Sequence, residues 1–137
     1  MHSETVIYTD YNGVERKETF FFNLTKAELL EMEMGIVGGF NAKVQRAIDA
    51  QDRPTLIATF KDLLLQSVGV KSADGRRFIK NDEVRNDFKE TEAYSILFMQ
   101  YATDADAASK FINGIVPADL AQEANKEIAP AARKKIK

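Results

Sequence analysis

The fold of this chain is set between residues 5 and 28, which read TVIYTDYNGVERKETFFFNLTKAE. β-Branched and aromatic residues fill positions 5–9, and such side chains suit a pleated, half-buried strand. The pair Asn12-Gly13 favours a tight hairpin turn, because both central positions of such a turn need positive φ. A return strand is predicted over residues 14–24. Thr25-Lys26-Ala27-Glu28 then forms a capping box, which predicts that a helix begins there.

A two-residue loop at Asn12-Gly13 fixes which side chains share a face of the hairpin. It pairs Ile7 with Glu18 and, two positions along, Thr5 with Phe20. Ile7, Phe20 and Phe22 would then lie on one face, which we expect to be buried.

The remainder of the chain reads as helices. Caps and apolar stripes predict about six of them, placed near residues 25–34, 40–50, 54–69, 82–90, 93–102 and 103–114, with a last short one opening at Pro117. The third carries a core stripe of six apolar residues: Leu56, Ile57, Phe60, Leu63, Leu64 and Val68. Residues 93–102 are apolar nearly all round, which predicts a central, buried, structural helix. Residues 70–78 contain the turn Asp74-Gly75 and fit either a second hairpin or a loop.

These elements fit one small domain of the α+β class that is mostly helical. It comprises an N-terminal β-hairpin (residues 1–24), a helical body (25–126) and a basic tail (127–137) expected to be flexible.

Composition disfavours several classes of function. The formal net charge is −2, so the chain has no overall field to attract nucleic acid or an anionic membrane. It has no cysteine, which excludes disulfides, thiolate catalysis and cysteine-ligated zinc. The longest apolar run is residues 96–99, far short of the ~20 residues that span a bilayer. With no signal peptide visible at the N-terminus, a cytoplasmic protein is expected.

Catalytic, cofactor and metal sites are not predicted. The single histidine is His2, which is expected to be a frayed terminal residue without an orienting partner. Asp104 and Asp106 fit helix N-terminal acids rather than metal ligands. The glycine-rich residues 35–39 lack the lysine and hydroxyl residue of a phosphate loop. An enzyme is therefore not expected.

Two groups of charged side chains are expected to be solvated. The first is basic and surrounds the Asp74-Gly75 turn: Lys71, Arg76, Arg77 and Lys80. The second lies on or beside the exposed side of the first helix: Glu28, Glu31 and Glu33.

One irregular apolar stretch is the predicted partner-binding site. It contains methionines, adjoins glycines and suits an adaptable binding surface. Its residues are Met32, Met34, Ile36, Val37 and Phe40.

Several short motifs resemble the tail assembly chaperones of long-tailed, siphovirus-type bacteriophages. They are FNLTKAE (22–28), DGRRFIK (74–80), Phe88, TEAYS (91–95), LFM (97–99), ATDA (102–105) and FINGIVP (111–117), and the resemblance covers about residues 18–117.

The resemblance implies a specific role. Such chaperones bind the long, helical tape measure protein and keep it soluble while tail tube subunits polymerise around it. They act in the host cytoplasm and are usually absent from the finished virion. Many are also made in a longer, frameshifted form, and Lys134-Lys135 fits an A-rich run of codons where ribosomes slip. The tail tube protein as a second partner, and self-association, stay open.

Three other functions compete with this one. The main alternative is a structural phage tail component, such as a tail tube or tail completion protein. A tube protein should be dominated by strands, which the predicted helices argue against. A small DNA-binding regulator is disfavoured by the charge balance, and an enzyme by the missing histidine and cysteine chemistry.

Overall fold

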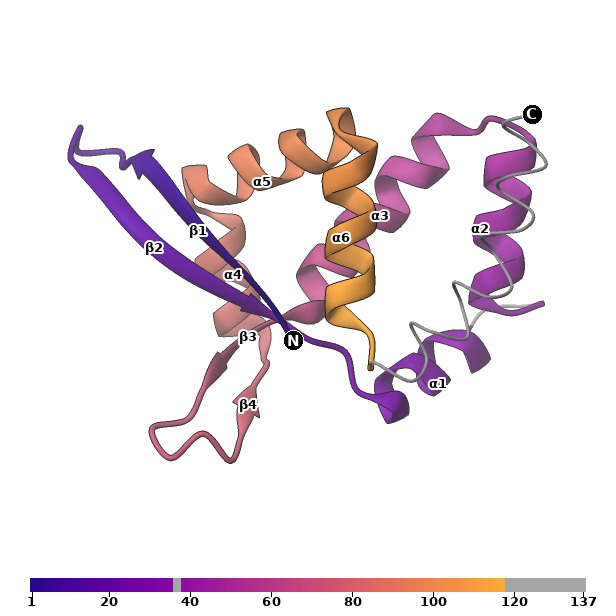
Figure 1. Cartoon of the computed structure of the whole chain (residues 1–137), viewed down its shortest axis with the longest axis horizontal. Coiled ribbons are helices and arrows are strands. Elements are labelled where there is room, and N and C mark those ends of the chain that lie inside the picture. Colours follow the sequence, from indigo (N-terminus) through magenta and orange to yellow (C-terminus); the bar gives the residue numbers. More distant parts are fainter. Residues whose placement is uncertain (36–37, 118–137) are drawn as a thin grey trace.

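The computed structural model describes residues 1–35 and 38–117 of the chain. Strands β1 (His2–Thr9), β2 (Glu15–Phe22), β3 (Val68–Lys71) and β4 (Phe78–Ile79) form one antiparallel sheet in the order β1-β2-β3-β4. The helices are α1 (Lys26–Met34), α2 (Phe40–Asp49), α3 (Arg53–Ser67), α4 (Asp82–Lys89), α5 (Glu92–Thr103) and α6 (Ala105–Ile115). Figure 1 shows the long β1–β2 hairpin projecting beside the helices. The predicted α+β class, with antiparallel strands followed by helices, is confirmed.

The register predicted for the first hairpin is wrong by one residue. Val6 pairs with Glu18, and Ile7 pairs with Lys17 rather than with Glu18. A shift of one residue exchanges the two faces of a strand. Val6 and Tyr8 are therefore buried, whereas Ile7, predicted to face the core, is 60% exposed.

The physical cause is a loop of three residues instead of two. The Asp10 N–H donates to the Val14 carbonyl at 2.8 Å, and Gly13, with φ of 80°, donates to the Asp10 carbonyl. The Asp10 carboxylate also accepts the N–H groups of Asn12 and Val14, each at 2.9 Å. This local hydrogen bonding by an aspartate side chain stabilises the wider loop.

The second sheet region is a hairpin, one of the two structures predicted for residues 70–78. Its strand β3 also pairs with the end of β2, where Phe22 lies opposite Val68. Gly69 is required there, because a Cβ at this position would lie 2.5 Å from the Phe78 ring. The predicted two-stranded hairpin is thus half of a four-stranded sheet.

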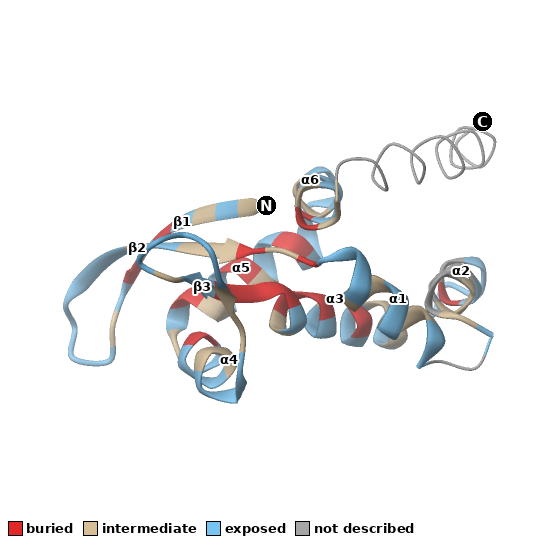
Figure 2. Ribbon diagram, turned by 90° about the horizontal axis from the view of Figure 1, so that it is seen from below, coloured by how far each residue is buried: buried red, intermediate tan, exposed pale blue. Residues whose placement is uncertain are grey.

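The core lies between the inner face of the sheet and helices α3 to α6. Its largest fully buried side chains include Phe22, Phe88 and Phe111, and the Phe22 ring packs edge-on against both of the others. Phe20 packs against this core, as predicted. In Figure 2 the buried residues gather where α3, α5 and β3 meet, while α1 holds no buried residue and the tip of the β1–β2 hairpin is exposed.

The predicted helix starts are confirmed by side-chain caps. Thr25 and Glu28 form the expected capping box at α1. Asn81 caps α4, and Asp104 caps α6 by accepting the N–H groups of Asp106 and Ala107. Leu30 on α1 is 59% exposed, because α1 lies at the periphery and buries none of its residues.

Helix α5 is not the fully buried helix that its composition predicted. Only Ala93, Leu97 and Tyr101 are buried, on the side that faces the core. Met99 is 54% exposed and Ile96 39% exposed. The side of α5 that carries Ile96 and Met99 is therefore exposed.

Two predictions cannot be compared with the structure. The short helix opening at Pro117 and the tail 127–137 lie outside the described residues, Pro117 itself excepted. Over the described ranges, no helix combines the length and the apolar character that crossing a membrane requires.

Candidate partner-binding surface

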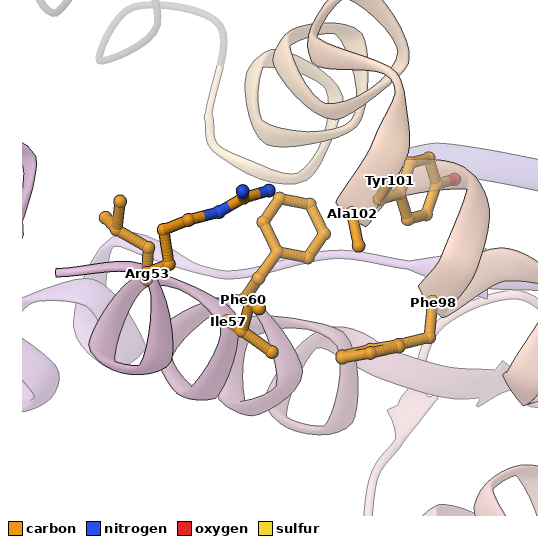
Figure 3. Close-up of a pocket in the computed structure, with 7 residues that line it drawn as sticks. Arg53, Ile57, Phe60, Phe98, Tyr101 and Ala102 are labelled. Carbon is orange, nitrogen blue, oxygen red and sulfur yellow. The ribbon is translucent and has the colours of Figure 1, made fainter. Parts of the chain in front are cut away.

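An apolar groove of about 240 Å³ opens between α3 and α5. Figure 3 shows the groove with side chains of α3 on one side and side chains of α5 on the other. It is lined by Arg53, Leu56, Ile57, Phe60, Phe98, Tyr101 and Ala102. Ile57 is 43% exposed, and Phe60 and Phe98 are half-buried. The groove thus offers aromatic and aliphatic surface to a partner.

Tyr101, which lines the groove, is hydrogen-bonded to the N-terminal strand β1. The Tyr101 hydroxyl donates to Oε1 of Glu4 at 2.9 Å, and the imidazole Nε2 of His2 lies 2.8 Å from the same oxygen. Burial, together with this hydrogen bond to a carboxylate, raises the pKa of Tyr101 well above its usual value. Tyr101 therefore remains neutral at physiological pH and acts as a fixed structural hydrogen-bond donor.

The prediction that His2 is a frayed terminal residue is wrong. His2 belongs to β1, its side chain is 17% exposed, and its ring packs edge-on against Phe111 at 5.3 Å. It lies so close to α6 that a Cβ on Gly114 would come within 2.8 Å of its ring. The strand pairing of β1 supplies the fixed position that the sequence did not reveal.

One charged residue stands at the rim of the groove. Arg53 is exposed at the first turn of α3, and Figure 3 shows its guanidinium extending toward the Phe60 ring. Neither a hydrogen bond nor an ion pair joins this guanidinium to any residue that the structure describes. A cation beside an apolar groove favours a ligand that combines apolar surface with a negative charge.

The predicted binding residues on and after α1 are only partly described. Met34 is 77% exposed, whereas Met32 is half-buried and packs against the core. Ile36 and Val37 lie outside the described residues, as does the side chain of Phe40. The predicted site at these five positions stays a prediction.

A second groove, of about 470 Å³, is lined by residues of α1, α2 and α3 and is more polar. Met32 lines it together with Glu28, Glu31, Lys43 and Asp62. Its mixed charges make it less suited than the α3–α5 groove to an apolar partner.

Two residues predicted to be solvated form an internal tie instead. The Lys80 side chain is only 10% exposed, and its ammonium donates to Oε2 of Glu28 at 2.6 Å. It also donates to the carbonyls of Asn23 at 2.6 Å and Gln66 at 3.3 Å. Lys80 thereby joins the end of the first hairpin, the start of α1 and the end of α3.

The sequence did not assign the α3–α5 groove as a site, although it contained a signal. Ile57 belonged to the stripe predicted to be buried, beside Leu56 and Phe60. Adjacent apolar residues such as Leu56 and Ile57 occur in any ordinary core-facing stripe, so this pair alone marks no uncovered face. The signal was α5, whose residues are apolar nearly all round although only Ala93, Leu97 and Tyr101 are buried.

Comparison with known families identifies the kind of protein that carries this surface. Neither the curated proteins nor the solved structures gave a match to the chain. The model of the phage tail assembly chaperone family, in contrast, matches all residues from 1 to 137. The match extends the resemblance noted over residues 18–117 to the whole sequence. An exposed apolar groove on a small α+β domain is compatible with such a role, and the chain belongs to the phage tail assembly chaperone family.

Proposed function

We propose that this chain binds the tape measure protein in the host cytoplasm and keeps it soluble while the tail tube assembles. The observation that carries the proposal is the uncovered apolar groove between α3 and α5. Exposed apolar surface lowers solubility unless it serves to bind another molecule. A long helical protein presents many apolar stripes of the kind that such a groove can cover.

We also infer that the protein acts by binding alone and not as an enzyme. In the described part of the chain, the single imidazole is engaged with Glu4 and packed against Phe111. Its hydrogen bond to Glu4 lies within β1, and its ring packs β1 against Phe111 of α6. A general base must instead reach a substrate proton.

Co-expression with the adjacent tape measure polypeptide tests the proposal. The tape measure polypeptide is expected in the soluble fraction only when this protein is present, and the two should co-elute on affinity purification and sizing. If the tape measure polypeptide stays insoluble and unbound, also with any frameshifted longer form, the proposal fails and a structural tail component becomes the better reading.

Two matched variants locate the contact. Ile57→Lys places a charge in the groove, whereas Ile112→Lys places one on α6 outside it, and the two isoleucines are similarly exposed at 43% and 39%. Ile57→Lys should abolish co-elution and Ile112→Lys should preserve it. Equal behaviour of the two variants would remove the groove from the proposal.

A further inference from the structure

We propose that the α3–α5 groove recognises an amphipathic helix that carries a carboxylate beside its apolar stripe, and that Arg53 selects this carboxylate. The inference rests on the proposed function, because it specifies which kind of segment of the partner binds to this groove. It assigns a specificity role to a residue that the hydrophobic pattern of the sequence does not single out.

The walls of the groove determine the conformation of the ligand. Both walls are helices, α3 and α5, and neither is a strand with a free edge. They offer no edge to which an extended peptide could add as a strand. A ligand entering apolar surroundings must therefore satisfy its own backbone, and a helix does so.

The spacing along α3 fits two turns of such a helix. Arg53, Ile57 and Phe60 follow one another on one side of α3, and they span ~10 Å at a rise of about 1.5 Å per residue. Phe98 faces them from α5 (Figure 3). This length accommodates two large apolar side chains one turn apart, with Arg53 reaching the next turn of the ligand.

The charge at the rim determines what lies beside those apolar side chains. The Arg53 guanidinium has no ion-pair partner among the described residues, and docking would exclude water from its surroundings. An arginine presents a planar fork of donors that matches a carboxylate in bidentate geometry. A glutamate or aspartate one turn from the apolar anchors would pair with it, whereas a lysine there would be repelled.

Binding of two designed peptides to the full-length protein tests this. Both are helical, with leucines spaced to form one stripe, and they differ only in a glutamate or a lysine one turn beyond the stripe. A third peptide, of the same composition but scrambled stripe, reports non-specific binding. Fluorescence anisotropy should show the glutamate peptide binding about fivefold more tightly than the lysine peptide, the scale of an ion pair at a partly exposed site.

A charge reversal separates pairing from general attraction. Arg53→Glu should reverse the preference, so that the lysine peptide binds about fivefold more tightly than the glutamate peptide. Arg77→Glu makes the same charge change on the exposed β3–β4 turn, outside the groove, and should leave the original preference intact. An unchanged preference in Arg53→Glu, or a loss in both variants, would overturn the role of Arg53.

The outcomes also distinguish this inference from the proposed function. If the tape measure polypeptide is solubilised but neither striped peptide binds better than the scrambled one, the helix-in-groove inference is wrong while the function stands. If the glutamate peptide binds with the expected preference but the tape measure polypeptide stays insoluble, the groove binds helices of another protein. Self-association that Ile57→Lys disperses would show a second copy in the groove and overturn the inference.

Discussion

Replacing Lys80 by methionine should destabilise the protein by about 2–3 kcal/mol, because the lysine ammonium joins three separate segments. Its two short hydrogen bonds, to the Asn23 carbonyl and to the Glu28 carboxylate, are both 2.6 Å long. Hydrogen bonds from a charged group contribute about 1.5–3 kcal/mol each. The Glu28 side chain is 35% exposed, so water replaces part of what it loses, and the sum is reduced accordingly.

Urea unfolding followed by circular dichroism measures this change. Methionine keeps the length and packing of the lysine stem, so the loss reports mainly on the ammonium. Lys71→Met is the matched control, since Lys71 belongs to the same basic cluster but is exposed with its ammonium over the Phe21 ring. Its cost should stay below about 1 kcal/mol.

Combining Lys80→Met with Glu28→Gln shows how much of the lost stability comes from the Lys80–Glu28 ion pair. The double-mutant cycle should show a coupling energy of about 1 kcal/mol between Lys80 and Glu28. A cost below about 0.5 kcal/mol for Lys80→Met would refute the reasoning, because surface substitutions generally fall in that range. Lys80 would then be the solvated turn residue that its sequence context predicted.

Three other perturbations test the packing and the electrostatics. Phe98→Ala should cost about 2 kcal/mol in urea unfolding, less than the 3–5 kcal/mol of a fully buried phenylalanine, because Phe98 is half-buried and lines the groove; a cost above 3 kcal/mol would make it a core residue. Gly114→Ala should lower the thermal midpoint, since its Cβ would lie 2.8 Å from the His2 ring, and His2→Gly should relieve this loss. Acid should lower the urea midpoint through Glu28. Burial raises the pKa of Glu28, but the hydrogen bonds that its carboxylate accepts from Lys80 and Thr25 have the larger combined effect, so the pKa is lowered overall. The stability contributed by Glu28 is therefore present above the unfolded pKa of about 4.3 and is lost as pH falls through the lower folded pKa; an equally steep acid loss in Glu28→Gln would contradict this.

Features governed by local sequence could be predicted, and those governed by contacts between distant segments could not. The Thr25–Glu28 capping box and the Asn81 cap involve residues three apart, so their residue types specify them directly. The tie at Lys80 joins residues 52 and 57 positions away in sequence. No periodicity within one segment encodes such a contact.

The hairpin register failed for a different physical reason. Asn12-Gly13 correctly marked the turn, but the preceding Asp10 competes for the same backbone donors and adds one residue to the loop. The two-residue loop would bury Ile7 and the three-residue loop buries Val6, and the strand sequence is compatible with either because both residues are apolar. The aspartate side chain decides between them, and its effect on every residue of β1 is an exchange of faces.

The same hydrophobic pattern predicted the core but did not reveal the α3–α5 groove, because apolar character alone does not say whether a surface is covered. Leu97 and Phe98 are adjacent on α5 and equally apolar, yet Leu97 is 1% exposed and Phe98 lines the groove. What separates them is the distribution of partners: the sheet and α6 pack against one side of α5, while α3 leaves part of the other side open. Tyr101 joins the two roles, since its hydroxyl is fixed by Glu4 of β1 while its ring forms part of the groove. The N-terminal strand, through Glu4 and His2, therefore sets the position of the surface that we propose for the partner, so that the shape of the groove depends on correct pairing of the hairpin.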